Sequence, residues 1–160
     1  MDSRELMLAL LDFRHDHEAG FVPLMAAVEG LTAEQASWRP DVHSHSIWQL
    51  VNHITFWNEY ILQRMRGLTK AGTEIDNEQT FGDPGNPMDD AAWQQTIERA
   101  DRVYRELRKA VADANESDLD QAFDDQGTPL KVVLGDIAMH DAYHIGQIMY
   151  VRKLQGWKRT

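Results

Sequence analysis

Cysteine is absent from this sequence of 160 residues. The fold therefore contains no disulfide bond, and any metal site or nucleophile has to be built without a thiolate from the chain. Long apolar runs are also missing: no stretch approaches the ~20 residues that cross a bilayer, so we expect no membrane partner. The first residues include the acids Asp2 and Glu5 and lack the pattern of a secretory signal, so we expect a cytoplasmic protein.

Clustered positive charge is a second absence. The chain has 16 basic and 26 acidic residues, for a formal net charge of -10. Its Lys and Arg residues are scattered, apart from a short basic tail at 153–159. Because phosphate backbones attract clustered Lys and Arg, we expect no nucleic-acid partner.

Several common catalytic motifs are missing as well. The sequence contains no glycine-rich nucleotide loop, no Gly-x-Ser-x-Gly elbow and no His-Glu-x-x-His. A di-iron carboxylate bundle needs Glu-x-x-His on two helices, and no Glu-x-x-His occurs here. These absences argue against nucleotide-loop enzymes, α/β-hydrolases, zinc proteases of the His-Glu-x-x-His type and di-iron bundles.

The sequence does contain apolar residues at alternating spacings of three and four, which predict four long amphipathic helices and no strand. Asp2 and Glu5 form a plausible capping box for the first helix, which Pro23 should kink and Gly30 should end. Capping and breaking residues place the helices at about 2–30, 46–66, 90–114 and 130–156. The pattern is typical of an all-α four-helix bundle, with residues 1–160 as a single domain.

A long polar segment, from Leu68 to Met88, separates the second and third predicted helices and is interrupted by glycines and prolines. A loop of this length in a compact domain is either disordered or has a task of its own. We expect it to act as a lid over a site.

Three histidines fall where buried side chains are expected. His140 and His144 are one turn apart on the apolar stripe of the last predicted helix, separated by about 40° around its axis, so both imidazoles can aim at one point. His53 lies at the buried edge of the second predicted helix. Three imidazoles converging from two helices would form a divalent metal site.

Simpler interpretations of these histidines remain open at this point. A buried histidine is often only a core residue that is hydrogen-bonded to a neighbour, and all three could be structural. If an ion binds, neutral imidazoles suit Zn, Ni, Fe or Cu and do not suit Mg or Ca. Three histidines leave a coordination position open, as in catalytic sites. Asp136, Asp141 and Gln49 are placed to orient the ligand imidazoles, although we expect both aspartates to be exposed.

Three blocks of the sequence resemble the DinB/YfiT-like metal-binding four-helix bundles. The blocks are Trp38-Arg39-Pro40, Ser46-Ile47-Trp48-Gln49-Leu50-Val51-Asn52-His53 and His140-x-x-x-His144-x-Gly146-Gln147. The resemblance implies that His53, His140 and His144 are metal ligands. It also implies an up-down-down-up bundle over nearly the whole chain, with the long loop between the second and third helices.

The resemblance further implies an activity. Some relatives resemble thiol S-transferases that use a low-molecular-weight thiol such as bacillithiol, and others look like mycothiol-dependent isomerases. We therefore expect a metal-dependent enzyme with a Zn, Ni or Fe ion, a thiol cosubstrate and a small electrophilic substrate. The alternatives are a metal-dependent hydrolase or isomerase of the same family, and a non-catalytic bundle that binds a metal or a small ligand. No catalytic residue is assigned.

The substrate pocket is expected beside the open coordination position. Helical-seam positions suggest four lining residues, namely His17, Trp57, Asn58 and Tyr143. For His17 the alternative is a core histidine bonded to a neighbour, and for Trp57 it is simple packing. By analogy with the family we expect a homodimer, with Trp93 and Tyr104 of the third predicted helix offering a contact face.

Overall fold

The computed structural model describes residues 1–70 and 72–159. These residues form seven α-helices and one short 3-10 helix, and they contain no β-strand: α1 (Ser3–His15), α2 (Leu24–Val28), α3 (Ala33–Ser37), α4 (Ile47–Met65), η1 (Glu78–Phe81), α5 (Asp90–Asp113), α6 (Glu116–Leu119) and α7 (Leu130–Gln155). Within the described residues, no helix combines the length and the apolar character needed to cross a bilayer.

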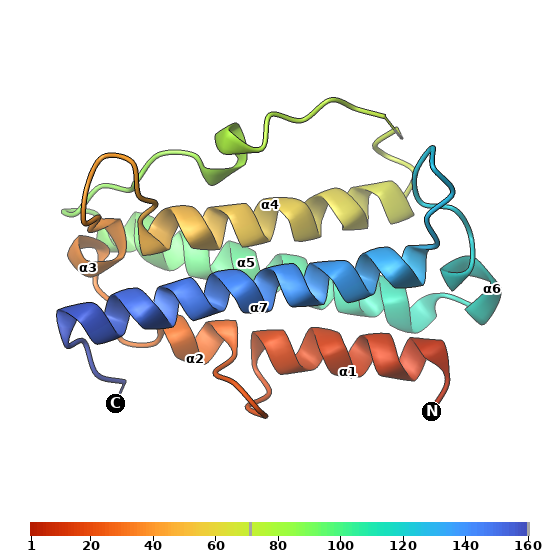
Figure 1. Ribbon diagram of the computed structural model, residues 1–160, viewed down its shortest axis with the longest axis horizontal. Coiled ribbons are helices and arrows are strands. Elements are labelled where there is room, and N and C mark those ends of the chain that lie inside the picture. Colours follow the sequence, from red (N-terminus) through yellow and green to blue (C-terminus); the bar gives the residue numbers. More distant parts are fainter. Residues whose placement is uncertain (71, 160) are drawn as a thin grey trace.

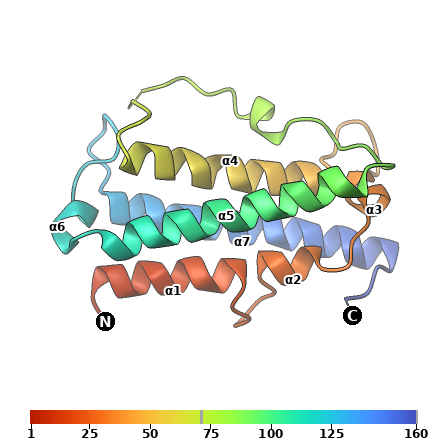
Figure 2. The same ribbon diagram turned by 180° about the vertical axis from the view of Figure 1, so that it is seen from behind.

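The four long helices pack side by side as a bundle (Figures 1 and 2). α1 contacts both α5 and α7, and α4 contacts the same two helices. α4 and α5 run in one direction while α1 and α7 run in the other, so the chain goes up, down, down and up. The predicted all-α bundle and its topology are confirmed.

Hydrogen bonds at the helix ends explain why α4 lies where it was predicted. The hydroxyl of Ser46 accepts from the backbone N–H of Gln49 at 3.1 Å, and the Gln49 side chain accepts from the backbone N–H of Ser46 at 3.0 Å. This capping box satisfies two free donors of the first turn. Beyond the other end, Gly67 has a φ of 70°, a left-handed conformation that glycine adopts at little cost.

The prediction of one continuous first helix is wrong. α1 ends at His15 and α2 begins at Leu24, so residues 16–23 form a connection. Pro23 is the N-cap of α2 and lies just before its first residue, where the missing backbone N–H costs little. It therefore does not kink a longer helix. His17 was predicted on the buried seam of that helix, but it lies in the connection and is exposed.

The buried face of α1 also differs from the prediction. Leu6, on the predicted seam, is 44% exposed, whereas Leu11 and Arg14 are buried. Arg14 is tolerated there because its Nη1 lies 2.6 Å from the carboxylate of Asp141 on α7. An apolar sequence pattern cannot reveal this buried face, because the face includes the charged Arg14. The carboxylate that compensates its charge, Asp141, lies far along the chain.

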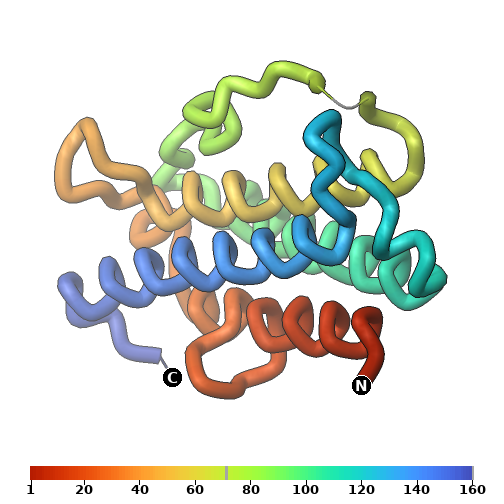
Figure 3. The backbone as a smooth tube through the Cα atoms, turned by 45° about the vertical axis from the view of Figure 1, so that its right-hand side comes forward, coloured from red at the N-terminus to blue at the C-terminus, as the bar shows by residue number. Residues whose placement is uncertain are grey.

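The segment between α4 and α5 (residues 66–70 and 72–89), called the return segment, runs back along the bundle over α4 (Figures 1 and 3), and this makes α5 parallel to α4. Its part from Glu78 to Gly85 is packed against α4. Phe81 is buried, and a Cβ added at Gly85 would lie only 2.3 Å from the indole of Trp48. The backbone at Gly85 also has a φ of 99°, so this close approach requires glycine.

Trp93 and Tyr104 on α5 lie in the core and are only 0% and 4% exposed. The indole N–H of Trp93 donates to the carbonyl of Leu31 at 2.9 Å, and the hydroxyl of Tyr104 donates to Asp12 at 2.6 Å. The prediction that these two residues offer a dimer face is therefore wrong, because both side chains are buried inside the bundle.

Candidate metal centre

Side chains from α4 and α7 bring three histidines together. His53 comes from α4, and His140 and His144 come from α7; one ring nitrogen of each lies within 4.8 Å of the others. The Nε2 atoms of His53 and His140 are 3.0 Å apart. The ring centroids of His53 and His144 are 4.7 Å apart, and those of His140 and His144 are 4.6 Å apart. The three imidazoles thus meet at a common centre, the convergence that the spacing predicted.

The hydrogen-bond partners of His53 determine which of its nitrogens carries the proton. Its Nδ1 lies 2.5 Å from the hydroxyl oxygen of Thr80, and that hydroxyl donates its own hydrogen to the carbonyl of Asn77 at 2.6 Å. Because Thr80 has only one hydrogen to give, its oxygen must accept from Nδ1–H of His53. The Nε2 atom of His53 therefore carries a lone pair.

The same reasoning applies to the two histidines of α7. Nδ1 of His140 lies 3.0 Å from the carboxylate of Asp141, and Nδ1 of His144 lies 2.6 Å from the amide oxygen of Gln147. Ionised carboxylates and amide oxygens can only accept, so both Nδ1 atoms carry hydrogens. Both Nε2 atoms are left with lone pairs.

Three lone pairs directed at one centre require a positive charge. The Nε2 lone pairs of His53 and His140, 3.0 Å apart, repel each other unless a proton shared between them or a metal cation beside them supplies positive charge. A transition-metal ion binds neutral imidazole nitrogen, whereas Mg²⁺ and Ca²⁺ prefer oxygen. The donor set therefore fits a divalent transition metal held by His53, His140 and His144, with a coordination position left open.

Asp141 connects His140 to a buried polar network. Its other oxygen lies 2.6 Å from Nη1 of Arg14 and accepts from Nδ2 of Asn58 at 2.8 Å, while Nη2 of Arg14 donates to Asn58 at 2.6 Å. Asp141 is 0% exposed, so the expectation that it lies at the surface is wrong. It can be buried because a guanidinium and two further hydrogen-bond donors satisfy its charge.

The 3-10 helix η1 covers one face of the His53 ring. Phe81 stacks on His53 with ring centroids 3.8 Å apart and planes 4° apart, and His45 also stacks on Phe81 at 3.7 Å. His45 Nε2 lies 2.8 Å from the carboxylate of Glu78, which keeps the stack in place. One face of a ligand ring is thereby shielded from water.

Sequence reasoning missed Thr80, Gln147 and Arg14 as residues that support the centre. Gln147 follows His144 at a spacing of three on a helix, a signal that could have found it. Thr80 gave no signal, because it lies in an irregular segment. Gln49, which was predicted to orient His53, instead caps α4 and donates to the carbonyl of Gly82 at 2.9 Å.

One cavity reaches the histidine centre, and a second lies beside Gln147, the partner of His144. The first, of about 320 Å³, reaches His140 and has a largely aromatic and aliphatic wall that includes Trp57, Tyr60, Phe123, Val133 and Ile137, with the exposed Asp136 at its edge. The second, of about 580 Å³, adjoins Gln147 and is lined by side chains that include His45, Leu50, Tyr143 and Tyr150. Each cavity is large enough for a small organic molecule.

The four predicted pocket residues lie in different places. Trp57 lines the cavity that reaches His140, and Tyr143 lines the one beside Gln147. Asn58 is only 2% exposed and belongs to the network around Asp141. His17 is exposed in the connection after α1, where its ring lies 5.5 Å from that of Phe13, so the structure does not bring it into the group of three histidines.

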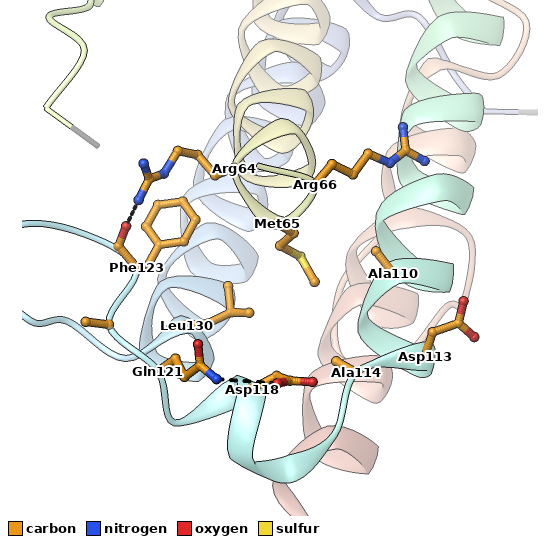
Figure 4. A pocket seen from close by; sticks show the side chains of 11 residues that line it. Arg64, Met65, Arg66, Ala110, Asp113, Ala114, Asp118, Gln121, Phe123 and Leu130 are labelled. Carbon is orange, nitrogen blue, oxygen red and sulfur yellow. Dashed lines mark hydrogen bonds between the residues drawn. The ribbon is translucent and has the colours of Figure 1, made fainter. Parts of the chain in front are cut away.

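A third cavity, of about 390 Å³, lies at the opposite end of α4, where Arg64 and Met65 face the N-terminal end of α7 (Figure 4). Among the described residues that line it there is no histidine. Arg64 donates to the carbonyl of Phe123, and Gln121 donates to Asp118. This cavity offers nothing comparable to the three imidazoles.

The metal-free protein should lose stability as the pH falls below about 6.5. Burial, with the nearby imidazoles of His144 and His140, lowers the pKa of His53 to about 3, and burial also lowers the pKa of His144. At pH values between the ordinary histidine pKa and these lowered pKa values, the unfolded chain binds more protons than the folded chain. Stability then falls with falling pH, by at most about 1.4 kcal/mol per pH unit for each such histidine.

Urea unfolding of the chelator-treated protein at about pH 7.5, 6.5 and 5.5 measures this effect. The His53→Ala variant should show a shallower decline over the same range, because one depressed imidazole has been removed. A free energy of unfolding that is constant or rises toward acid would contradict the prediction.

Comparison with known protein families matches residues 23–148 to the DinB superfamily. A search of curated proteins finds no match. The matched range includes α4, the return segment, α5 and most of α7, and therefore all three histidines of the centre. With most of its length matched, this chain belongs to the DinB superfamily.

Proposed function

We propose that this protein is a metal-dependent enzyme that transfers a low-molecular-weight thiol to an electrophilic carbon of a small molecule. The observation that carries the proposal is the group of three imidazoles, each held by an Nδ1 partner, with their Nε2 lone pairs directed at one centre beside an apolar cavity. We propose Zn, Ni or Fe as the ion and the cytoplasm as the compartment.

A divalent metal held by these histidines supplies positive charge that lowers the pKa of a nearby thiol, so that the thiol is a thiolate near neutral pH. The chain itself contributes no sulfur nucleophile, since it contains no cysteine. The sulfur therefore comes from a cosubstrate such as bacillithiol. Thr80, Asp141 and Gln147 keep the imidazoles neutral at Nε2 and fixed in orientation.

The apolar cavity beside His140 provides a place for the electrophile. Trp57, Tyr60 and Phe123 offer aromatic surfaces, and the ring of Tyr60 lies edge-on to both Trp57 and Phe123. Such a wall favours an apolar or aromatic substrate body and keeps water from the reacting carbon.

The proposed reaction needs no reagent other than the thiol and the electrophile. The thiol gives its proton to solvent, a sulfur–carbon bond forms, and the bond from carbon to the leaving group breaks with its electron pair on that group. For an epoxide the leaving group is the ring oxygen, which stays attached and takes up a proton. The residues of the chain position the two reactants and exclude water; none forms a covalent bond.

A conjugation assay tests the proposal. The protein is incubated with bacillithiol, mycothiol or cysteine and with monobromobimane or an epoxide, after chelation and again after addition of Zn²⁺, Ni²⁺ or Fe²⁺. We expect turnover that requires both the thiol and the metal. It should fall to the rate of the metal-free protein in the His53→Ala variant.

Two outcomes would reject the thiol-transfer proposal. Product formed from water rather than thiol would identify a metal-dependent hydrolase, because the same open position can activate water. Metal binding by calorimetry with no turnover of any electrophile would identify a non-catalytic metal-binding bundle.

A further inference from the structure

Three aromatic side chains line the cavity that reaches His140, namely Trp57, Tyr60 and Phe123. The ring of Tyr60 meets that of Trp57 at 81°, with centroids 5.6 Å apart, and that of Phe123 at 76°, with centroids 6.3 Å apart. Rings that meet nearly at right angles can enclose a ligand from more than one side. The cavity volume of about 320 Å³ is enough for a small organic group.

The Trp57 ring is fixed by the same segment that supports the metal centre. Its indole N–H donates to the side-chain oxygen of Asn77 at 3.3 Å, and the backbone carbonyl of Asn77 accepts the hydroxyl hydrogen of Thr80. Thr80 in turn accepts from the ring of His53. The aromatic wall and the histidines therefore share a support, so the cavity has a defined position relative to the centre.

A single carboxylate lies at the edge of this cavity. Asp136 is exposed, and the residues that line the cavity include no second acid and no lysine or arginine among those that the structure describes. The nearest lysine or arginine along α7, Lys131, pairs with Asp120 instead. Asp136 therefore gives the aromatic cavity a negative edge, in a chain whose net charge of -10 already attracts cations.

We propose that this cavity binds a small organic cation, an alkyl-substituted ammonium, and that the electrophilic substrate carries this group. The faces of Trp and Tyr rings attract cations, and they do so most strongly where water is excluded. The carbon atoms of such a cation pack against the aliphatic wall, while its charge interacts with the rings and with Asp136. A strongly hydrated inorganic ion does not suit this wall, because most of the wall cannot replace its water.

The geometry of α7 sets the orientation of the ligand. Asp136 precedes His140 by four residues, so the two lie on the same face of the helix, ~6 Å apart along its axis. The cationic group therefore lies at the Asp136 end of the cavity and the reacting carbon at the His140 end. This separation keeps the positive charge of the ligand away from the metal ion. The position of the reacting carbon rests on the proposed function, whereas the binding of the cation does not.

Calorimetric titration of the full chain with choline tests the binding. The neutral reference is the dimethylbutanol in which a carbon atom replaces the nitrogen of choline, so that the two ligands share a shape and differ in charge. We expect choline to bind at least about fivefold more tightly. Tyr60→Leu should lower the affinity for choline roughly tenfold, whereas Tyr60→Phe, which keeps the ring, should stay within about twofold of wild type.

Charge variants test the role of the carboxylate. Asp136→Asn should lower the affinity for choline by roughly two- to fivefold, a modest loss because water screens an exposed carboxylate. Glu98→Gln is the matched control, because it removes one negative charge from the outer face of α5, which does not line the cavity. This control should bind choline as the wild type does.

Two results of the titrations would overturn the proposal. One is equal affinity for choline and its neutral counterpart. The other is a loss of affinity in Asp136→Asn with none in Tyr60→Leu. That second pattern would place the cation in the neighbouring cavity, which Asp136 also borders and which Leu10 and Phe13 line.

Turnover tests the assignment of the substrate. In the conjugation assay, glycidyltrimethylammonium, an epoxide with an ammonium group, is compared with neopentyloxirane, its neutral isostere. With each rate divided by its uncatalysed rate, kcat/KM should favour the cationic epoxide by about tenfold, and Tyr60→Leu should reduce this preference. Turnover without a preference would overturn the assignment. Turnover of neither epoxide would reject the proposed function and the substrate assignment together, and the titrations alone would then decide whether the cavity binds cations.

Discussion

Replacing His144 by alanine should abolish the stabilisation of the protein by a divalent transition metal. In the wild type, Zn²⁺ or Ni²⁺ at about 100 times its dissociation constant should raise the free energy of unfolding by about 2.7 kcal/mol. In His144→Ala only two nitrogens remain at the centre, those of His53 and His140. We expect this variant to lose nearly the whole metal-dependent increase in melting temperature. Elemental analysis should also show that it no longer contains stoichiometric metal.

His17→Ala is the matched control for this measurement, because it removes an exposed histidine in the connection after α1 by the same substitution. That variant should retain the full metal-dependent shift. Equal metal content in wild type and His144→Ala, or a melting temperature that is indifferent to chelator in the wild type, would contradict a three-histidine centre.

Replacing Asp141 by alanine should destabilise the fold and weaken metal binding together. The variant leaves the guanidinium of Arg14, only 2% exposed, without its counter-charge. Removing one partner of a buried ion pair typically costs about 3–5 kcal/mol. His140 also loses the acceptor of its Nδ1–H, and loss of such a partner lowers metal affinity by roughly 10- to 100-fold.

A double variant separates the two effects of Asp141. Arg14→Met combined with Asp141→Leu replaces the ion pair by apolar side chains, and this should recover much of the stability, because no charge is left buried alone. Metal affinity should stay low, since His140 still lacks its acceptor. Urea unfolding and metal titration of both variants provide the test. Stability of Asp141→Ala within about 1 kcal/mol of wild type would argue that the carboxylate does not hold this network.

The helices α4, α5 and α7 and the histidine group could be predicted because their signals are local. Ser46 with Gln49, and Gly67 beyond the other end, determine α4 through hydrogen bonds within a few residues. His140 and His144 share a face because they are one turn apart on a helix. His53 was expected at the buried edge of α4, so it could meet them once α4 and α7 packed together, and the family resemblance pointed to the same three residues.

The buried ion pair and the hydrogen-bond acceptor of His53 could not be predicted, because they depend on contacts between distant parts of the chain. Arg14 is buried because Asp141 lies across the bundle, and neither residue resembles a core residue when the sequence alone is considered. Thr80 reaches His53 only because the return segment packs over α4, with Gly85 set against Trp48. Irregular segments leave no periodic pattern, so the acceptor of a ligand imidazole could not be recognised in advance.

The distribution of the ligands along the chain affects how the centre is made during synthesis. His53 is translated 87 residues before His140, with the return segment and all of α5 between them. A nascent chain that ends before α7 holds one of the three imidazoles and has no counter-charge for Arg14. The three-histidine group that could hold an ion therefore exists only after translation of α7, when the finished bundle has closed.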